Sequence, residues 1–300
     1  MAGSRFARAS VALALALAAP LILASPLYGQ GTGNGHKDNK GNGNGNGHKS
    51  TPPSSLPLPS PSIGLAAAAL PAVWLDDASL LTPGTAAFTV GVNRWAGADL
   101  NEVDFPVVSA AIGLAPRFQI GASVPRVVGS ADGTGPVGGI GTSYISGKVA
   151  LLTGADGVKL AVSPVLQILG NGAVQALAPQ QSRTQVGLPV SLEVSQGPTH
   201  VFASAGVFSG GAWFAGGGTA IQATARLGLS FSVTRAWAND PTTGITGDRR
   251  EVSGGVSYFV RPQIALYGSL GQTIATTDAN GAGTTVGGGV TFLLSTHVTH

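Results

Sequence analysis

The chain has 300 residues, of which 43% are hydrophobic and 10% charged, with a formal net charge of +3 and no cysteine. Soluble domains carry about 25% charged residues, so the composition argues against an ordinary soluble domain, and the lack of cysteine excludes disulfides and thiolate metal sites. The small positive charge, with no basic stripe or stacking platform, argues against nucleic-acid binding.

Residues 1–29 have the pattern of a secretory signal peptide. Arg5 and Arg8 form a positive start, and an apolar run follows over residues 11–24, about the length expected for the apolar part of a signal. The run is short for a membrane anchor and is interrupted by Pro20. We therefore expect export, with residues 1–29 removed.

Residues 30–62 form a low-complexity segment, first rich in Gly, Asn, His and Lys and then in Pro and Ser. Such a sequence has too few apolar residues to fold and is expected to be a disordered linker. His36 and His48, each within a Gly-His-Lys triplet, are weak candidates for metal binding, because ordering a flexible segment around a metal costs conformational entropy. We expect no metal and no cofactor.

Residues 63–84 are modestly apolar and include Trp74, Asp76 and Asp77. Two interpretations are open for this segment. It either leads into the following domain from the periplasm or folds partly into its interior as a plug.

From residue 85 onwards, runs of alternating hydrophobicity follow one another. In residues 186–195, valines and leucines at even positions alternate with Gly187, Ser191 and Glu193 at odd positions. Successive side chains of a strand point to opposite faces, so this period indicates strands with one apolar and one mixed face. Twelve such strands are predicted, at about 85–95, 103–114, 118–128, 142–153, 158–169, 185–196, 200–208, 212–223, 227–237, 249–259, 264–273 and 284–294.

A membrane barrel explains this pattern best. The mean hydropathy is +0.28, yet no apolar run beyond residue 30 approaches the ~20 residues that a spanning helix needs. Only helices and closed barrels satisfy every backbone group in lipid. We predict an all-β fold, a transmembrane antiparallel up-and-down β-barrel of about 12 strands over residues 85–300.

The connections predict the orientation of this barrel. Those after strands two, four, six, eight and ten are tight, whereas those after strands one, three, five, nine and eleven are expected to be longer, and residues 209–211 are an exception. Outer-membrane barrels have short periplasmic turns and longer outer loops. Both termini are therefore expected in the periplasm of a Gram-negative bacterium.

Aromatic residues near the strand ends predict two interfacial girdles. The girdle expected at the outer end consists of Trp95, Trp213 and Trp237. The girdle expected at the periplasmic end consists of Phe118, Phe202, Tyr258, Phe259 and Phe292.

Polar residues on the mixed faces are candidates for lining the lumen: Gln119, Lys148, Lys159, Gln167 and Glu193. Lys148, Lys159 and Glu193 come from three successive strands and are able to pair, because buried charges are usually paired. They form either a polar patch along a narrow path or an interior salt-bridge plug.

No catalytic constellation is predicted. His200 is the single histidine of the predicted strands, and at the periplasmic start of its strand it is expected to be a solvated turn residue. A hydrolase needs a nucleophile and a base within hydrogen-bond reach, so we expect no enzyme.

Residues 114–125, Leu-Ala-Pro-Arg-Phe-Gln-Ile-Gly-Ala-Ser-Val-Pro, form a turn followed by a strand that ends in proline, and Gly139-Ile140-Gly141 precedes a lysine-containing strand at Lys148. Over about residues 80–170 this resembles the meta-pathway phenol-degradation, or transporter-like, family of outer-membrane barrels. Thr142 stands where that family has an acidic residue. The resemblance implies a barrel for uptake of small, often hydrophobic compounds.

The expected function is therefore passive passage of small solutes, hydrophobic or aromatic ones included, through an outer-membrane pore. The alternative is a non-conducting structural or adhesive barrel with a periplasmic binding tail. Expected partners are outer-membrane lipid and lipopolysaccharide, the barrel-assembly machinery and the solute.

Overall fold

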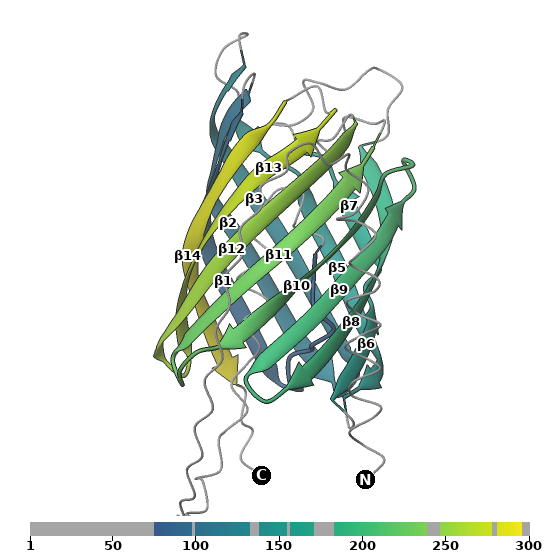
Figure 1. Ribbon diagram of the computed structural model, residues 1–300, viewed down its shortest axis with the longest axis vertical. Helices are drawn as coiled ribbons and strands as arrows, with labels where there is room; N and C mark the ends of the chain where they lie inside the picture. The colour runs from purple at the N-terminus through teal and green to yellow at the C-terminus, as the bar shows by residue number, and fades with distance from the viewer. Residues whose placement is uncertain are drawn as a thin grey trace, which may run out of the picture.

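The computed structural model describes residues 75–97, 100–132, 138–154, 157–170, 183–238, 247–277 and 281–295. The predicted signal peptide, the linker, His36 and His48 lie outside them. All regular structure in the described residues is β-strand, wound into a barrel of steeply tilted strands (Figure 1). Within the same residues, no helix is long and apolar enough to cross a membrane.

The strands are β1 (Thr85–Gly97), β2 (Leu100–Ala115), β3 (Phe118–Asp132), β4 (Gly139–Ile140), β5 (Ser143–Thr153), β6 (Val158–Val162), β7 (Val165–Ile168), β8 (Thr184–Gln196), β9 (Thr199–Phe208), β10 (Trp213–Gln222), β11 (Leu227–Trp237), β12 (Asp248–Arg261), β13 (Ile264–Thr276) and β14 (Gly283–Ser295). The short β4 pairs only with β3, and β6 and β7 both lie between β5 and β8 as one strand interrupted at Ser163 and Pro164. The wall therefore has twelve strands, as predicted.

The first and last strands close the barrel. β1 and β14 pair antiparallel from Thr85 opposite Ser295 to Gly97 opposite Gly283. All other strand pairs are antiparallel too, and each strand of the wall lies next to its neighbour in sequence. Closure pairs the two strands that would otherwise be edges, which a barrel in lipid requires.

Alternation sorts the side chains onto two faces. The outward face is apolar: Val186, Val207 and Leu294, for example, are about 60% exposed. The inward face is rich in small polar residues, including Thr89, Ser191 and Ser204, which are almost fully buried. Hydroxyl pairs link neighbouring strands there, such as Thr89 with Thr291 at 2.9 Å. An apolar outside and a polar inside are the reverse of a soluble barrel and mark a transmembrane one.

The two ends of the barrel differ in their connections. Thr85, Ser295 and the short connections after β2, β5, β8, β10 and β12 lie at one end, which we call the turn end. Gly197 in the β8–β9 turn has a φ of 58°, a conformation that glycine adopts without strain. The opposite end is called the loop end.

The prediction of a long loop after the first strand is wrong. β1 continues to Gly97 and β2 begins at Leu100, so only residues 98–99 connect them. Both strands extend past their predicted ends, because ladder pairing continues to Ala96 opposite Asn101.

Three of the predicted girdle residues face the interior instead. Trp95 and Phe259 are 3% and 5% exposed, and Phe202 lies on the same face of β9 as the buried Ser204. The prediction used residue type and strand position, whereas strand alternation decides the direction of the side chain. Trp213, Trp237, Phe118, Tyr258 and Phe292 lie on the outward face.

Candidate functional site

The segment just before β1 lies inside the barrel. Leu75, Ala78, Ser79 and Leu81 are all buried. They are positioned by hydrogen bonds and ion pairs to inward side chains of β3, β5, β6 and β8, described below. We call residues 75–83 the luminal segment. The described part of residues 63–84 thus lies in the interior, and the choice between a lead-in and a plug for the whole stretch stays a prediction.

Glu193 on β8 is the centre of the contacts. Its Oε2 accepts a hydrogen bond from the Ser79 hydroxyl at 2.6 Å, and its Oε1 lies 2.8 Å from Lys159 Nζ. Lys159 also donates to the Ser79 hydroxyl at 2.7 Å. Ser79 is thus held between an acid and a base of neighbouring strands, and it both donates and accepts.

Lys148 on β5 holds the segment at a second point. Its ammonium forms an ion pair with Asp76 and donates to the backbone carbonyls of Asp77 and Ser79 at 3.2 and 3.1 Å. The side chain is 8% exposed, so water compensates little of this charge, and these three partners all belong to the luminal segment. A buried lysine without such partners would be strongly disfavoured.

A third contact fixes the end of the segment that joins β1. The backbone N–H of Leu81 donates to Gln119 Oε1 on β3 at 2.8 Å. A Cβ added to Gly113 on β2 would lie 2.5 Å from the carbonyl oxygens of Leu81 and Thr82. Glycine is therefore required there for the segment to approach the wall so closely.

Asp77 has an unusual protonation equilibrium. Burial raises its pKa from 3.8 to about 7, and the carboxylates of Asp76 and Glu193 add to the rise, while Lys148 opposes it. Its carboxylate accepts a hydrogen bond from the Ser79 N–H at 2.9 Å. The luminal segment therefore holds a carboxyl group that titrates near neutral pH.

The structure places all five predicted lumen residues inside the barrel. It brings four together round the luminal segment: Gln119, Lys148, Lys159 and Glu193. Gln167 is buried elsewhere, opposite Gln185 nearer the loop end. Sequence reasoning missed Asp76, Asp77 and Ser79 as the partners. One signal was available in the sequence. The predicted lumen residues include two lysines but only one glutamate, and Asp76 and Asp77 lie shortly before the first strand, so they were candidates to balance the second lysine.

His200 was predicted to be a solvated turn residue, but the structure shows that it also contacts other side chains. Its Nδ1 lies 3.0 Å from the Ser195 hydroxyl and 3.2 Å from Glu193 Oε1. A Ser-His-acid triad needs the serine and the acid on opposite ring nitrogens. Here both contact the same nitrogen, so the histidine has no relay geometry and belongs to the Glu193 network.

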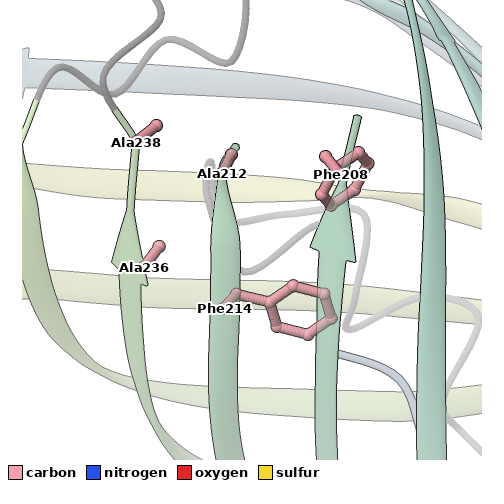
Figure 2. Packing of buried hydrophobic residues seen from close by; sticks show 5 residues of the cluster. All are labelled: Phe208, Ala212, Phe214, Ala236 and Ala238. Atoms are coloured by element: carbon pink, nitrogen blue, oxygen red, sulfur yellow. The ribbon is translucent and has the colours of Figure 1, made fainter. Parts of the chain in front are cut away.

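An apolar patch lies on the inner wall at the loop end. Phe208 ends β9 and Phe214 lies on β10, with ring centroids 6.5 Å apart, and Ala212, Ala236 and Ala238 complete the patch (Figure 2). Tyr144 of β5 packs against it. A Cβ on Gly187 would lie 2.4 Å from the Phe208 ring, so the ring occupies the space that this glycine leaves on β8.

No protein-family model and no curated protein sequence matches the chain. Among solved structures, it is similar to the COG4313 outer membrane channel from Pseudomonas putida F1, with a TM-score of 0.58 and 13% identity over 73% of this chain and 98% of the other. It also resembles the NanC porin, with a TM-score of 0.50 and 10% identity over 68% and 98% of the two chains. The fold is that of outer-membrane barrels. At these identities the comparisons show the fold alone, and membership of the phenol-degradation family stays a prediction.

Proposed function

We propose that the protein is a passive channel of a bacterial outer membrane for small solutes, hydrophobic or aromatic ones among them, and that it performs no covalent chemistry. The proposal rests on the apolar outward face, the small polar inward residues and the luminal segment. A fold shared with a channel and a porin is consistent with it.

The observation that carries the proposal is the way the lumen is filled at the turn end. There the luminal segment lies against the wall through Ser79, Asp76 and Leu81. Twelve strands enclose more space than the eight whose side chains fill a barrel, and the inward residues here are mostly small. A barrel built to be solid would be filled by large side chains of its own wall, whereas a tethered segment is able to narrow a path and to move.

The class of solute is inferred from the two ends of the lumen. At the loop end Phe208 and Phe214 are almost fully buried, whereas Tyr144, which packs against them, is only partly buried and offers an aromatic surface that suits an aromatic or aliphatic solute. The Lys148, Lys159 and Glu193 network at the turn end is polar. A small solute with an apolar body and a polar group matches this sequence of surfaces.

The orientation follows from the two ends of the barrel. We place the turn end in the periplasm, because short turns lie there in outer-membrane barrels. Both termini would then be periplasmic, in line with the predicted signal peptide. Lipopolysaccharide would surround the loop end, and the barrel-assembly machinery would insert the chain.

The test is single-channel conductance of the refolded mature protein in a planar bilayer. Three forms are compared: the mature chain, a variant lacking residues 31–62, and a variant lacking residues 31–83. The second keeps the luminal segment and is the matched control for the third. Discrete steps that grow only when residues 63–83 are lost would support a channel narrowed by this segment.

Silence from all three forms, with folding shown by heat-modifiable gel migration, would refute the open path. It would favour the alternative, a non-conducting structural or adhesive barrel. The close fit of Ser79 between Glu193 and Lys159 is the feature that favours this second candidate, because it also suits a permanent plug.

A further inference from the structure

The outward face of the barrel carries few charges, and they are unevenly placed. Away from the residues next to the tight turns, five charged side chains point outward among those that the structure describes: Arg94, Arg126, Arg235, Asp248 and Arg250. All five lie in the half of their strand that is nearer the loop end. The outward faces of β5 to β10 carry none among the described residues. These five side chains thus carry a net positive charge, and they lie on one side of the barrel.

Two of the arginines face each other directly. Arg235 on β11 and Arg250 on β12 are paired residues of the sheet, and like charges in this position repel each other. Asp248 lies between them: Arg235 donates to both of its carboxylate oxygens at 2.9 and 3.0 Å, and Arg250 Nη2 lies 3.4 Å from Oδ2. The three side chains carry a net charge of +1.

Two tryptophans flank this group. The Arg235 guanidinium lies 5.4 Å from the centroid of the Trp213 ring. Trp237 pairs with Trp213 on one side and with Asp248 on the other. Tryptophan favours the level of the lipid headgroups, so the guanidinium groups are held at that depth.

From this arrangement we infer that Arg235 and Arg250, framed by Trp213 and Trp237, bind a phosphate group of a phosphorylated glycolipid in the outer leaflet. The inference rests on the orientation given under the proposed function, which places the loop end in that leaflet. Guanidinium groups bind phosphate with two parallel hydrogen bonds, and basic clusters next to a membrane recognise anionic headgroups. The indole rings would lie along the first part of the acyl chains.

Two features favour a defined site over a uniform belt. Arg235 is preoriented, since Asp248 and the Trp213 ring hold its guanidinium from two sides. A side chain that is already ordered loses less entropy when it binds. Arg94 and Arg126 lie on the same outward face, each with apolar residues two positions before and after it on its own strand: Val92 and Ala96, and Val124 and Val128.

The test uses the full mature chain, folded in detergent and titrated with bisphosphorylated lipid A, with bound lipid counted by native mass spectrometry. The variant R235Q/R250Q is compared with R94Q/R126Q, which removes the same charge from the same face. We expect the first to bind roughly tenfold more weakly, which corresponds to about 1.4 kcal/mol, because hydrogen bonds between charged groups are stronger than those between neutral groups. R94Q/R126Q should change the affinity for lipid A less than about twofold. Lipid A stripped of its phosphates should bind weakly, and with the same affinity, to wild type and to R235Q/R250Q.

Equal losses in the two double variants, or wild-type binding that does not depend on phosphate, would overturn the inference. If the glutamine variant does not fold, R235K/R250K supplies the comparison, since it keeps both charges. Lysine lacks the planar fork, so several-fold weaker binding is expected and an unchanged affinity would again overturn the site. None of these results depends on whether the lumen conducts, so failure here leaves the proposed function untouched.

Discussion

Lys159 Nζ and Glu193 Oε1 lie 2.8 Å apart on neighbouring strands, and the Ser79 hydroxyl contacts both side chains. The pair is therefore both part of the wall and a clamp for the luminal segment. This arrangement makes the position of the segment depend on charges that point mutations are able to change one at a time.

Glu193→Gln should loosen the luminal segment. The amide keeps its shape but loses the charge that binds Lys159 and Ser79. Breaking a buried pair costs about 3–5 kcal/mol. Because Lys159 is 25% exposed, we expect Glu193→Gln to weaken the attachment of the luminal segment to the wall by a smaller amount, about 1–2 kcal/mol. The measurement is the rate at which a membrane-impermeant maleimide labels an Ala78→Cys reporter, which is unique because the chain has no cysteine.

The control for this variant is Ser191→Ala. Ser191 is fully buried on the same strand and bonds to Ser204 at 3.2 Å, so its loss perturbs the wall without touching the luminal segment. We expect several-fold faster labelling of Cys at position 78 with Glu193→Gln and the wild-type rate with Ser191→Ala. Equal rates in all three proteins would show that Glu193 does not hold the segment.

The titration of Asp77 should make the segment sensitive to pH. We call the luminal segment seated when it lies against the wall as observed and released when it does not. In the seated form the pKa of Asp77 is raised from 3.8 to about 7, chiefly by burial. The seated form therefore binds a proton more tightly than a released form with an ordinary pKa. The stabilisation of the seated form by this proton is complete below pH 3.8 and is lost as the pH rises through about 7. We expect maleimide labelling of Ala78→Cys, corrected for the intrinsic pH dependence of the thiol, to increase between pH 5 and 8.

Asp77→Asn separates this effect from that of the other titratable groups that face the site: Lys148, Lys159, Asp76, Glu193 and His200. Asparagine mimics the protonated carboxyl group at all pH values. The corrected labelling rate should then be flat between pH 5 and 8 if Asp77 is responsible. A slope identical to that of the wild type would assign the pH dependence to another group.

Gly113→Ala should displace the luminal segment from the wall. The new Cβ would lie 2.5 Å from two backbone carbonyl oxygens of the segment, at Leu81 and Thr82, whereas the nearest atoms to a Cβ on Gly121 are 3.4 Å away. Gly121→Ala on the adjacent strand is therefore the matched control. In planar bilayers we expect larger or more frequent conductance steps from Gly113→Ala only. Identical traces from both variants would contradict the close approach.

The strands were predictable because alternation is a local property that each strand carries in its own sequence. β10, with three successive glycines, gives the weakest signal, yet the strand predicted at residues 212–223 agrees with its observed bounds, Trp213–Gln222. The luminal segment was not decided by sequence, because its position depends on Gln119, Lys148 and Glu193, which lie 38 or more residues away. Only the assembled wall brings these partners together.

The direction of Trp95 could have been predicted. It follows Thr89 and Asn93 at odd positions of β1, while Phe88 and Val92 at even positions are the apolar set that faces out. The preference of tryptophan for interfaces describes an average over barrels and does not override the two-residue period of a strand. Inside the barrel the ring has a specific environment, with the Arg249 guanidinium 5.3 Å from its centroid.

This difference between the tryptophans is open to a direct spectroscopic test. Trp213 and Trp237 face outward, whereas Trp95 faces inward and is 3% exposed. Variants that retain only one of the four tryptophans, with phenylalanine at the other three positions, are reconstituted in vesicles of brominated phospholipid. Bromine quenches an indole that touches the acyl chains, so we expect strong quenching for Trp213 and Trp237 and little for Trp95. Strong quenching of Trp95 would return it to the girdle and contradict the register of β1.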